Sequence, residues 1–354
     1  MRGTWLRVMV AVGCVVGWVV GLTIADRPAL GQSVGEARRS ADTLTVRLIE
    51  PGSNVFGDSK VTFHAEVRGL KGRSVRLGWT LAANHRTIDR AETVVRPDDG
   101  TASVPLTVRV PPVREGVVFP VELTVTVTGS SPADAATQRR RLWVFGREPF
   151  ADRQEWLKEL DITLFDDEGS TADQFDAAEI PYRFLKNTDA LAEVDAGLVV
   201  VAEGVSWADR PGLGPAVLKL AASGRPVLCL APADGALPWP GSDQKSARPE
   251  VSLRSAQAIL ALDKRLDTTA WSAEGEAAHT VIRLMAKNDD VVAAFAEGQD
   301  GWPWLELHYR GSGGRLVVCG YGVIRHWEAG PTSRFLLARL LEELVPLKTA
   351  QSNR

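Results

Sequence analysis

The sequence predicts a protein of two domains, a β-sandwich followed by an α/β domain with a doubly wound, mostly parallel sheet. Three observations lead to this prediction. Short segments rich in β-branched residues, separated by turn residues, fill residues 43–146. Apolar strand-like runs alternate with helical segments over residues 150–346. The length of 354 residues is sufficient for two domains and a leader segment.

The first 31 residues have the parts of a secretion signal peptide. Arg2 and Arg7 supply positive charge, and residues 6–24 are almost wholly apolar. Ala29 and Gly31 are small residues at positions −3 and −1 of a cleavage site before Gln32. We therefore expect an exported bacterial protein, periplasmic or extracellular. The alternative is an uncleaved membrane anchor, since about 19 apolar residues can span a bilayer.

Seven strands are expected in the sandwich, after a linker at residues 32–42. They cover residues 43–49, 60–68, 74–81, 88–95, 102–110, 118–128 and 140–145. Seven short strands in about 105 residues are typical of an immunoglobulin-like sandwich. Trp79 would lie on the third strand, where such domains often bury a tryptophan, although the cysteine pair of antibody domains is absent.

The α/β domain is predicted from strands and helices that follow one another. Strands are expected at residues 162–166, 181–185, 197–202, 226–231, 304–309 and 315–320. Helices are expected at residues 171–178, 189–194, 213–222, 254–262, 275–285 and 333–344. Continuous apolar runs such as 197–202 indicate strands that are covered on both faces. Residues 347–354 are expected to form a disordered tail.

Composition and charge exclude some classes of function. With 45% hydrophobic and 24% charged residues, the chain has enough apolar material for two cores. The formal charge of −3 predicts no nucleic-acid partner. The one basic cluster, at residues 139–141, is interpreted as protection of an exposed strand rather than a phosphate site. Cys229 and Cys319 lie in apolar strand patterns, which predicts buried thiols rather than a disulfide framework.

Two segments of the α/β domain resemble the class I glutamine amidotransferase-like fold, which is flavodoxin-like. Residues 224–231 (Gly-Arg-Pro-Val-Leu-Cys-Leu-Ala) look like the strand that leads to that family's nucleophile elbow. Residues 320–328, with His326 and Glu328, look like its terminal strand with a His-x-Glu pair. The resemblance implies the chemistry of the family's active members. In these, a cysteine attacks a glutamine amide, the histidine acts as the base and the glutamate orients the histidine.

The elbow itself departs from the family's pattern. When Pro-Val-Leu is aligned, the nucleophile position is Ala231, and Cys229 and Ala233 replace the flanking glycines. The next residue, Pro232, has no N–H to donate to an oxyanion. We therefore expect a catalytically degenerate domain, a pseudoenzyme. A substitute triad of Cys229, His326 and Glu328 remains an alternative, as does a purely packed loop histidine.

Other polar residues are predicted at the carboxyl ends of the strands, where ligands of such sheets bind. The candidates for ligand binding are Asp166, Glu203, Trp207, Asp234, Tyr321, His326 and Trp327. The cluster 166–168 is interpreted as solvated turn carboxylates, with a divalent-metal site as the alternative; no metal and no cofactor are predicted. Trp239, Trp302, Trp304 and Trp327 allow either sugar stacking or core packing.

Three functions follow from these observations. The leading hypothesis is a non-catalytic binding or protein-interaction protein of the cell envelope, with an envelope protein or carbohydrate as partner. The second is a hydrolase that acts on envelope carbohydrate or peptide through Glu203, His326 and Glu328. The third is a structural component of a larger assembly that docks through the sandwich.

Overall fold

The computed structural model describes residues 43–50, 52–69, 72–96, 99–131, 134–238, 248–267, 280–285, 291–293 and 302–346. The predicted signal peptide, linker and C-terminal tail lie outside these ranges. The described residues all belong to one compact unit. No helix among the described residues is both long and apolar enough to cross a membrane.

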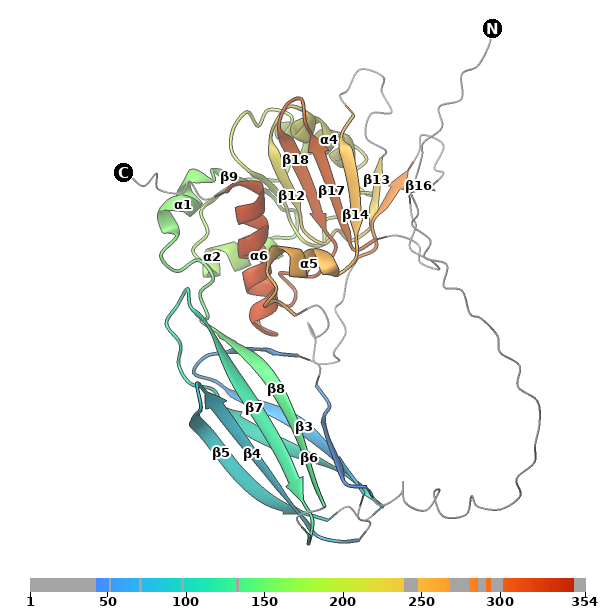
Figure 1. Ribbon diagram of the computed structural model, residues 1–354. Helices are drawn as coiled ribbons and strands as arrows, with labels where there is room; N and C mark the ends of the chain where they lie inside the picture. Colours follow the sequence, from blue (N-terminus) through green and yellow to red (C-terminus); the bar gives the residue numbers. More distant parts are fainter. Residues whose placement is uncertain are drawn as a thin grey trace, which may run out of the picture. The chain divides into compact units, whose positions relative to one another are not determined.

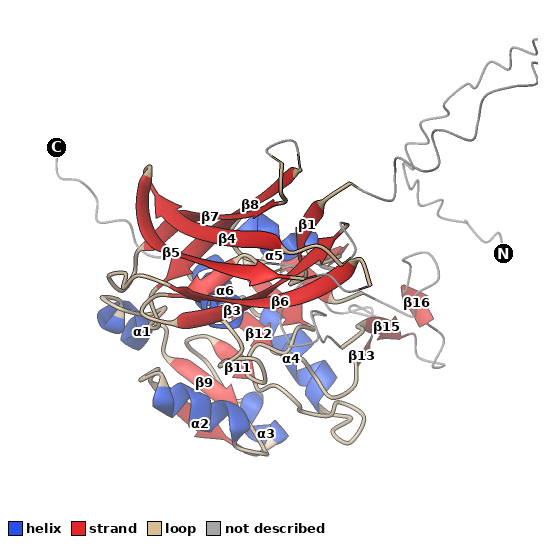
Figure 2. Ribbon diagram, turned by 90° about the horizontal axis from the view of Figure 1, so that it is seen from below, coloured by secondary structure: helices blue, strands red, loops and turns tan. Residues whose placement is uncertain are grey.

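The sandwich consists of two sheets packed on one core (Figures 1 and 2). A three-stranded sheet contains β1 (Thr45–Leu48), β3 (Lys60–Arg68) and β6 (Thr101–Arg109). A five-stranded sheet has the order β2 (Asn54–Phe56), β8 (Ala135–Phe145), β7 (Val118–Thr128), β4 (Val75–Ala83) and β5 (Arg86–Val95). The sandwich prediction is confirmed. Trp79 is partly buried and packs against the core.

The sandwich differs from the predicted seven strands by β2, where the sequence indicates a turn. Polar Asn54 and the preceding Pro-Gly-Ser hide this three-residue strand from a period-2 pattern. β2 runs parallel to the end of β8 and pairs only with residues Trp143–Phe145. The rest of β8, with Arg139–Arg141, has a partner strand on one side only among the described residues. Arg140 donates there to the carbonyl oxygens of Leu48 and Glu50.

The α/β domain is built on a seven-stranded, mostly parallel sheet. Its order is β10 (Tyr182–Leu185), β9 (Ile162–Phe165), β11 (Val199–Val201), β12 (Pro226–Cys229), β18 (Gly314–Cys319), β17 (Trp304–Tyr309) and β14 (Glu250–Arg254). The first five strands are parallel, β17 is antiparallel to β18, and β14 is antiparallel to β17. The predicted fold class is confirmed.

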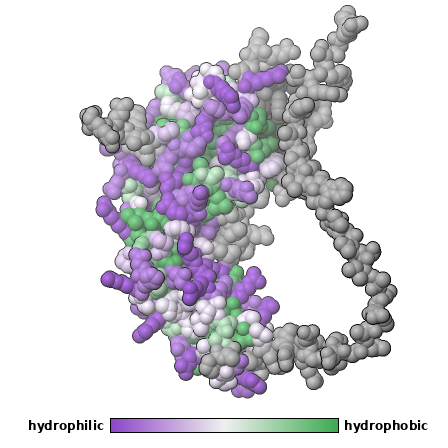
Figure 3. Space-filling view, in the orientation of Figure 1, coloured by the Kyte–Doolittle hydropathy of each residue, from purple (hydrophilic) through white to green (hydrophobic). Residues whose placement is uncertain are grey.

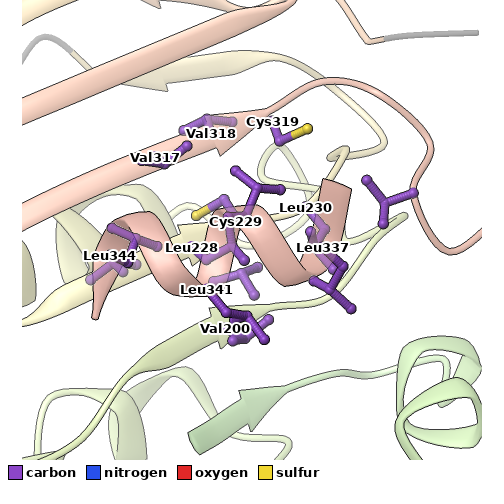
Figure 4. Packing of buried hydrophobic residues seen from close by; sticks show 14 of the residues in the cluster. Val200, Leu228, Cys229, Leu230, Val317, Val318, Cys319, Leu337, Leu341 and Leu344 are labelled. Atoms are coloured by element: carbon purple, nitrogen blue, oxygen red, sulfur yellow. The ribbon is translucent and has the colours of Figure 1, made fainter. Parts of the chain in front are cut away.

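Six helices accompany this sheet among the described residues. They are α1 (Gln154–Glu159), α2 (Ser170–Ala177), α3 (Thr188–Leu191), α4 (Leu213–Ala222), α5 (Gln257–Leu262) and α6 (Pro331–Leu344). Figure 4 shows the core in which Leu337, Leu341 and Leu344 of α6 pack with strand residues such as Val200 and Leu228. On the face that Figure 3 shows, hydrophilic side chains predominate and hydrophobic ones form separate patches.

One predicted helix is wrong where it can be compared. Residues Arg283–Met285, expected to end a helix, form β15, which pairs with β13 (Ala236–Pro238) and β16 (Val291–Ala293). Three residues are too few to show either a helical or an alternating period, so the pattern is ambiguous there. The predicted helix at 254–262 begins at Gln257, because residues 250–254 pair with β17 instead.

Candidate functional site

The loops that follow the parallel strands meet at the carboxyl edge of the sheet. Gly204, after β11, donates its N–H to the carbonyl of Ala231, after β12, at 2.8 Å. Ala233 donates back to the carbonyl of Val205 at 3.1 Å. The structure therefore joins loops that the sequence predicts to be neighbours.

Asp166 is fully buried at the end of β9, and its carboxylate faces backbone donors rather than an open site. One oxygen accepts the N–H groups of Glu168 and Gly169, and the other accepts those of Thr171 and Ala172, at 2.8–3.1 Å. Thr171 and Ala172 lie in the first turn of α2, where backbone N–H groups have no carbonyl partner within the helix. Asp166 thus shapes the β9–α2 turn, and all four of these bonds lie within the chain.

The neighbouring carboxylate, Asp167, forms an ion pair with Arg210, whose guanidinium also lies 5.7 Å from the ring centroid of Phe165. Among the described residues, no three His, Cys, Asp or Glu side chains are arranged to hold a metal ion.

Glu203 joins β11 to the segment that follows β18. Its carboxylate accepts the N–H of Ile324 at 2.7 Å and that of Arg325 at 3.3 Å, and it forms an ion pair with the Arg325 guanidinium. Its own N–H donates to the hydroxyl of Thr171. Burial outweighs these interactions and raises the pKa of the Glu203 carboxyl above its usual value. Glu203 therefore fixes the 321–330 segment from one side.

His326 lies beside Glu203, and Gly322 separates them. A Cβ placed on Gly322 would be 3.2 Å from a carboxylate oxygen of Glu203 and 3.3 Å from Cδ2 of His326. The Nε2 atom of His326 is buried and has no hydrogen-bond partner within the described part of the chain. The structure thus brings together two of the three residues of the predicted hydrolase site.

Glu328, the third of these residues, is directed elsewhere. Its side chain is 76% exposed and forms an ion pair with Arg334 at 2.7 Å. The glutamate of the His-x-Glu pair therefore binds the Arg334 guanidinium and not the His326 imidazole that it would orient in the resemblance. Trp327 is buried beside the same guanidinium, at 5.4 Å from the ring centroid, and belongs to the hydrophobic core.

Asp234 and Trp207 form a second local unit at this edge. One Asp234 oxygen accepts the Ser206 hydroxyl and the N–H groups of Trp207 and Ala208, at 2.8–3.0 Å. The indole of Trp207 is buried in the core. The other Asp234 oxygen and the indole N–H have no partner among the described residues. Asp234 thus ties the loop after β12 to the loop after β11.

The elbow position holds no nucleophile. Ala231 is buried and carries only a methyl group, and the carbonyl of Pro232 accepts the Thr280 hydroxyl. Cys229 lies on β12 opposite Val318, so it faces the opposite side of the sheet from Cys319. Both thiols are fully buried (Figure 4), and burial raises both pKa values, that of Cys319 to about 12.

The remaining candidates are parts of the interior. Tyr321 is buried, and burial raises the pKa of its phenol. Trp304 is buried and donates its indole N–H to Glu306 at 2.8 Å. Trp302 is partly buried, and Trp239 lies outside the described residues.

Three residues of this edge were missed by the sequence analysis: Thr171, Arg325 and Arg334. Arg334 offers a usable signal, because it occupies the helical face of Leu337, Ala338 and Leu341. A charged residue on an apolar face indicates a buried and fully paired group. Thr171 and Arg325 show no pattern of this kind, since their roles depend on which loops meet.

The pKa of His326 provides a test of this geometry. Burial, followed by repulsion from Arg325, lowers the pKa of the imidazole below its usual value. The folded state therefore binds the proton less readily than the unfolded state does. As the pH falls from 6.5 toward the folded pKa of His326, the free energy of unfolding should decrease. In an NMR titration of the ring protons we expect Arg325→Gln to raise the pKa of His326. An unchanged or lower value would contradict the placement of Arg325.

Comparisons with known proteins concern mainly the sandwich. No protein-family model matches the chain, and neither does any curated protein. Sporulation control protein Spo0M from Bacillus subtilis is 17% identical, with a TM-score of 0.21, over 33% of this chain and 55% of Spo0M, so the chain spans about half of that protein.

Two single domains give similar values. The CARDB domain of the PF1109 protein from Pyrococcus furiosus is 16% identical, with a TM-score of 0.20, over 29% of this chain and 92% of the domain. A PapD-like domain of human CEP192 is 12% identical, with a TM-score of 0.20, over 36% of this chain and 96% of the domain. All three likenesses are below 20% identical and have TM-scores of 0.20 to 0.21, so they show neither the family nor the function of this chain.

Proposed function

We propose that this chain is a non-catalytic binding or protein-interaction protein of the cell envelope. Its α/β domain would be a degenerate relative of the class I glutamine amidotransferase-like fold, carried behind an immunoglobulin-like domain. The predicted signal peptide supports the location. A partner would be an envelope protein or carbohydrate.

The observation that carries this proposal is the structure of the elbow. Nucleophilic catalysis needs a nucleophile within hydrogen-bond reach of a base that a third group orients. Here the nucleophile position is the Ala231 methyl group, both thiols are fully buried, and Glu328 pairs with Arg334. Two of the three parts of the catalytic arrangement, the nucleophile and the group that orients the base, are thus missing together, and only the histidine remains.

The acidic residues of the edge support the same proposal. Among the described residues, Asp166, Glu203 and Asp234 accept nine hydrogen bonds, eight of them from backbone N–H groups. Carboxylates bonded in this way hold loops in place. We infer that the edge is a rigid surface rather than a set of groups free for acid–base chemistry.

The hydrolase hypothesis keeps one favourable observation. Glu203, whose pKa is raised, and His326, whose Nε2 has no partner among the described residues, border the same glycine. A general acid and a general base are often such a pair of groups with perturbed pKa values. This second candidate therefore needs an activity test.

Hydrolysis of ester, amide and glycoside model substrates distinguishes the two proposals. We expect the purified wild-type chain and its His326→Ala variant to hydrolyse them at the same rate as buffer. Arg315→Ala, at the start of β18 and therefore at the opposite end of that strand from the His326 segment, serves as the control; its partly exposed side chain pairs with Glu343. Turnover that disappears in His326→Ala and persists in Arg315→Ala would establish the hydrolase instead.

A further inference from the structure

Three consecutive polar residues at the start of α6 are buried: Thr332, Ser333 and Arg334. Each is bonded to another segment. The Thr332 hydroxyl accepts the side-chain amide of Asn54 in β2 at 3.0 Å. The Ser333 hydroxyl donates to the carbonyl of His326 at 2.6 Å. The first turn of this helix therefore contacts both the sandwich and the segment that carries His326.

Arg334 makes both kinds of contact with one side chain. Its Nε donates to the Trp327 carbonyl at 2.9 Å and Nη2 to Glu328 at 2.7 Å, both in the 321–330 segment. Its Nη1 donates to the carbonyl of Arg147, just after β8, at 3.1 Å. The guanidinium also lies over the Phe56 ring of β2, 4.9 Å from its centroid.

A buried guanidinium with these partners has little freedom to move. Leaving any of its N–H groups unpaired would cost the desolvation of a charged donor, which is more than the net value of an ordinary hydrogen bond. The positions of Trp327 and Glu328 are therefore tied to those of Phe56 and Arg147 through one rigid planar group.

β2 is itself held in place on its other side. Asp267, after α5, accepts the N–H groups of Ser53 and Asn54 with one oxygen, at 2.9 Å each. Phe145, at the end of β8, packs on Phe335 of α6 at 4.7 Å between ring centroids and belongs to the core of the α/β domain. The end of the sandwich is thus continuous with that core.

We propose that the first turn of α6 is a coupling element, through which docking of β2 holds the His326-bearing segment 321–330 in its observed conformation. Arg334 is the positioning residue in this arrangement. Glu203 holds the same segment at two other residues, Ile324 and Arg325. A change at β2 of the sandwich is therefore transmitted to the carboxyl edge of the sheet. This inference goes beyond the proposed function and does not depend on it.

Hydrogen exchange of the full chain tests the coupling from the sandwich side. Phe56→Ala removes a partly exposed ring that contacts Arg334 but makes no hydrogen bond through its side chain. We expect amide exchange in peptides covering 321–330 to become about tenfold faster, because the Arg334 guanidinium loses the aromatic ring against which it packs. Arg334→Lys keeps the positive charge but loses the planar set of N–H donors, so it should also make amide exchange in these peptides faster.

Arg339→Lys is the matched control on the same helix, since Arg339 pairs with Asp263 and Glu342 and not with the 321–330 segment. Its exchange in 321–330 should equal that of the wild type. Unchanged exchange of 321–330 in Phe56→Ala would overturn the proposal. Equal acceleration of 321–330 and of β9 would also overturn it, because it would show a global loss of stability rather than coupling. Phe56→Ala remains decisive if Arg334→Lys does not fold.

Discussion

Replacing Asp166 by alanine is expected to lower the free energy of unfolding by more than about 3 kcal/mol. The carboxylate is fully buried and accepts four backbone N–H groups at the β9–α2 turn. In the variant these donors lose a charged acceptor, and at least the donors of Thr171 and Ala172 stay buried. Asp166→Asn should also be destabilising, because the amide nitrogen would face two of the same donors.

Denaturant unfolding followed by circular dichroism measures this effect. Glu168→Ala, two residues away on an exposed side chain, is the matched control and should change the free energy of unfolding by less than about 0.5 kcal/mol. If Asp166→Ala proves as stable as the control, Asp166 is not the anchor of this turn, and its role as a candidate ligand reopens.

Replacing Gly320 by alanine is expected to cost about 3 kcal/mol. The added Cβ would lie 2.3 Å from the carbonyl oxygen of Thr280 and 2.8 Å from that of Pro303. Both contacts are with backbone, which cannot rotate away. The same two residues bond to the Gly320 backbone, through its carbonyl and its N–H. The substitution therefore separates β18 from its neighbours just before the 321–330 segment.

Gly311→Ala is the control for this prediction, because the added Cβ would meet no atom of the described residues within 4 Å, its chain neighbours aside. We expect its unfolding midpoint to remain near that of the wild type. Thermal unfolding of both variants gives the comparison directly. A Gly320→Ala protein with the wild-type unfolding midpoint would contradict the close packing of Gly320 against the carbonyl oxygens of Thr280 and Pro303.

Much of the architecture could be predicted because its periodic patterns are long. Residues 118–128 alternate over eleven positions, and 213–222 has a helical apolar face closed by Gly224. β2 and β15 could not be predicted in this way. Each has three residues, and what defines them is a partner strand far away in sequence.

The candidate site was predictable in location but not in role. Parallel strands end at one edge, which is sufficient to bring Asp166, Glu203, Asp234 and the 321–330 segment together. Whether a carboxylate points outward to a ligand or inward to backbone N–H groups depends on loop conformation. Sequence spacing contains no information about that, and this is why Glu328 appears as an orienting group in the sequence and as the partner of Arg334 in the structure.

The absence of a nucleophile at the carboxyl edge is tested most directly by the reactivity of Cys229. The folded full chain is treated with iodoacetamide at neutral pH, and labelling of each cysteine is followed by peptide mass spectrometry. Because its thiol is fully buried and burial raises its pKa, Cys229 should be labelled no faster than Cys319, and both only after denaturant unfolds the chain. Rapid labelling of Cys229 in the folded protein, slowed by His326→Ala, would contradict a non-catalytic function.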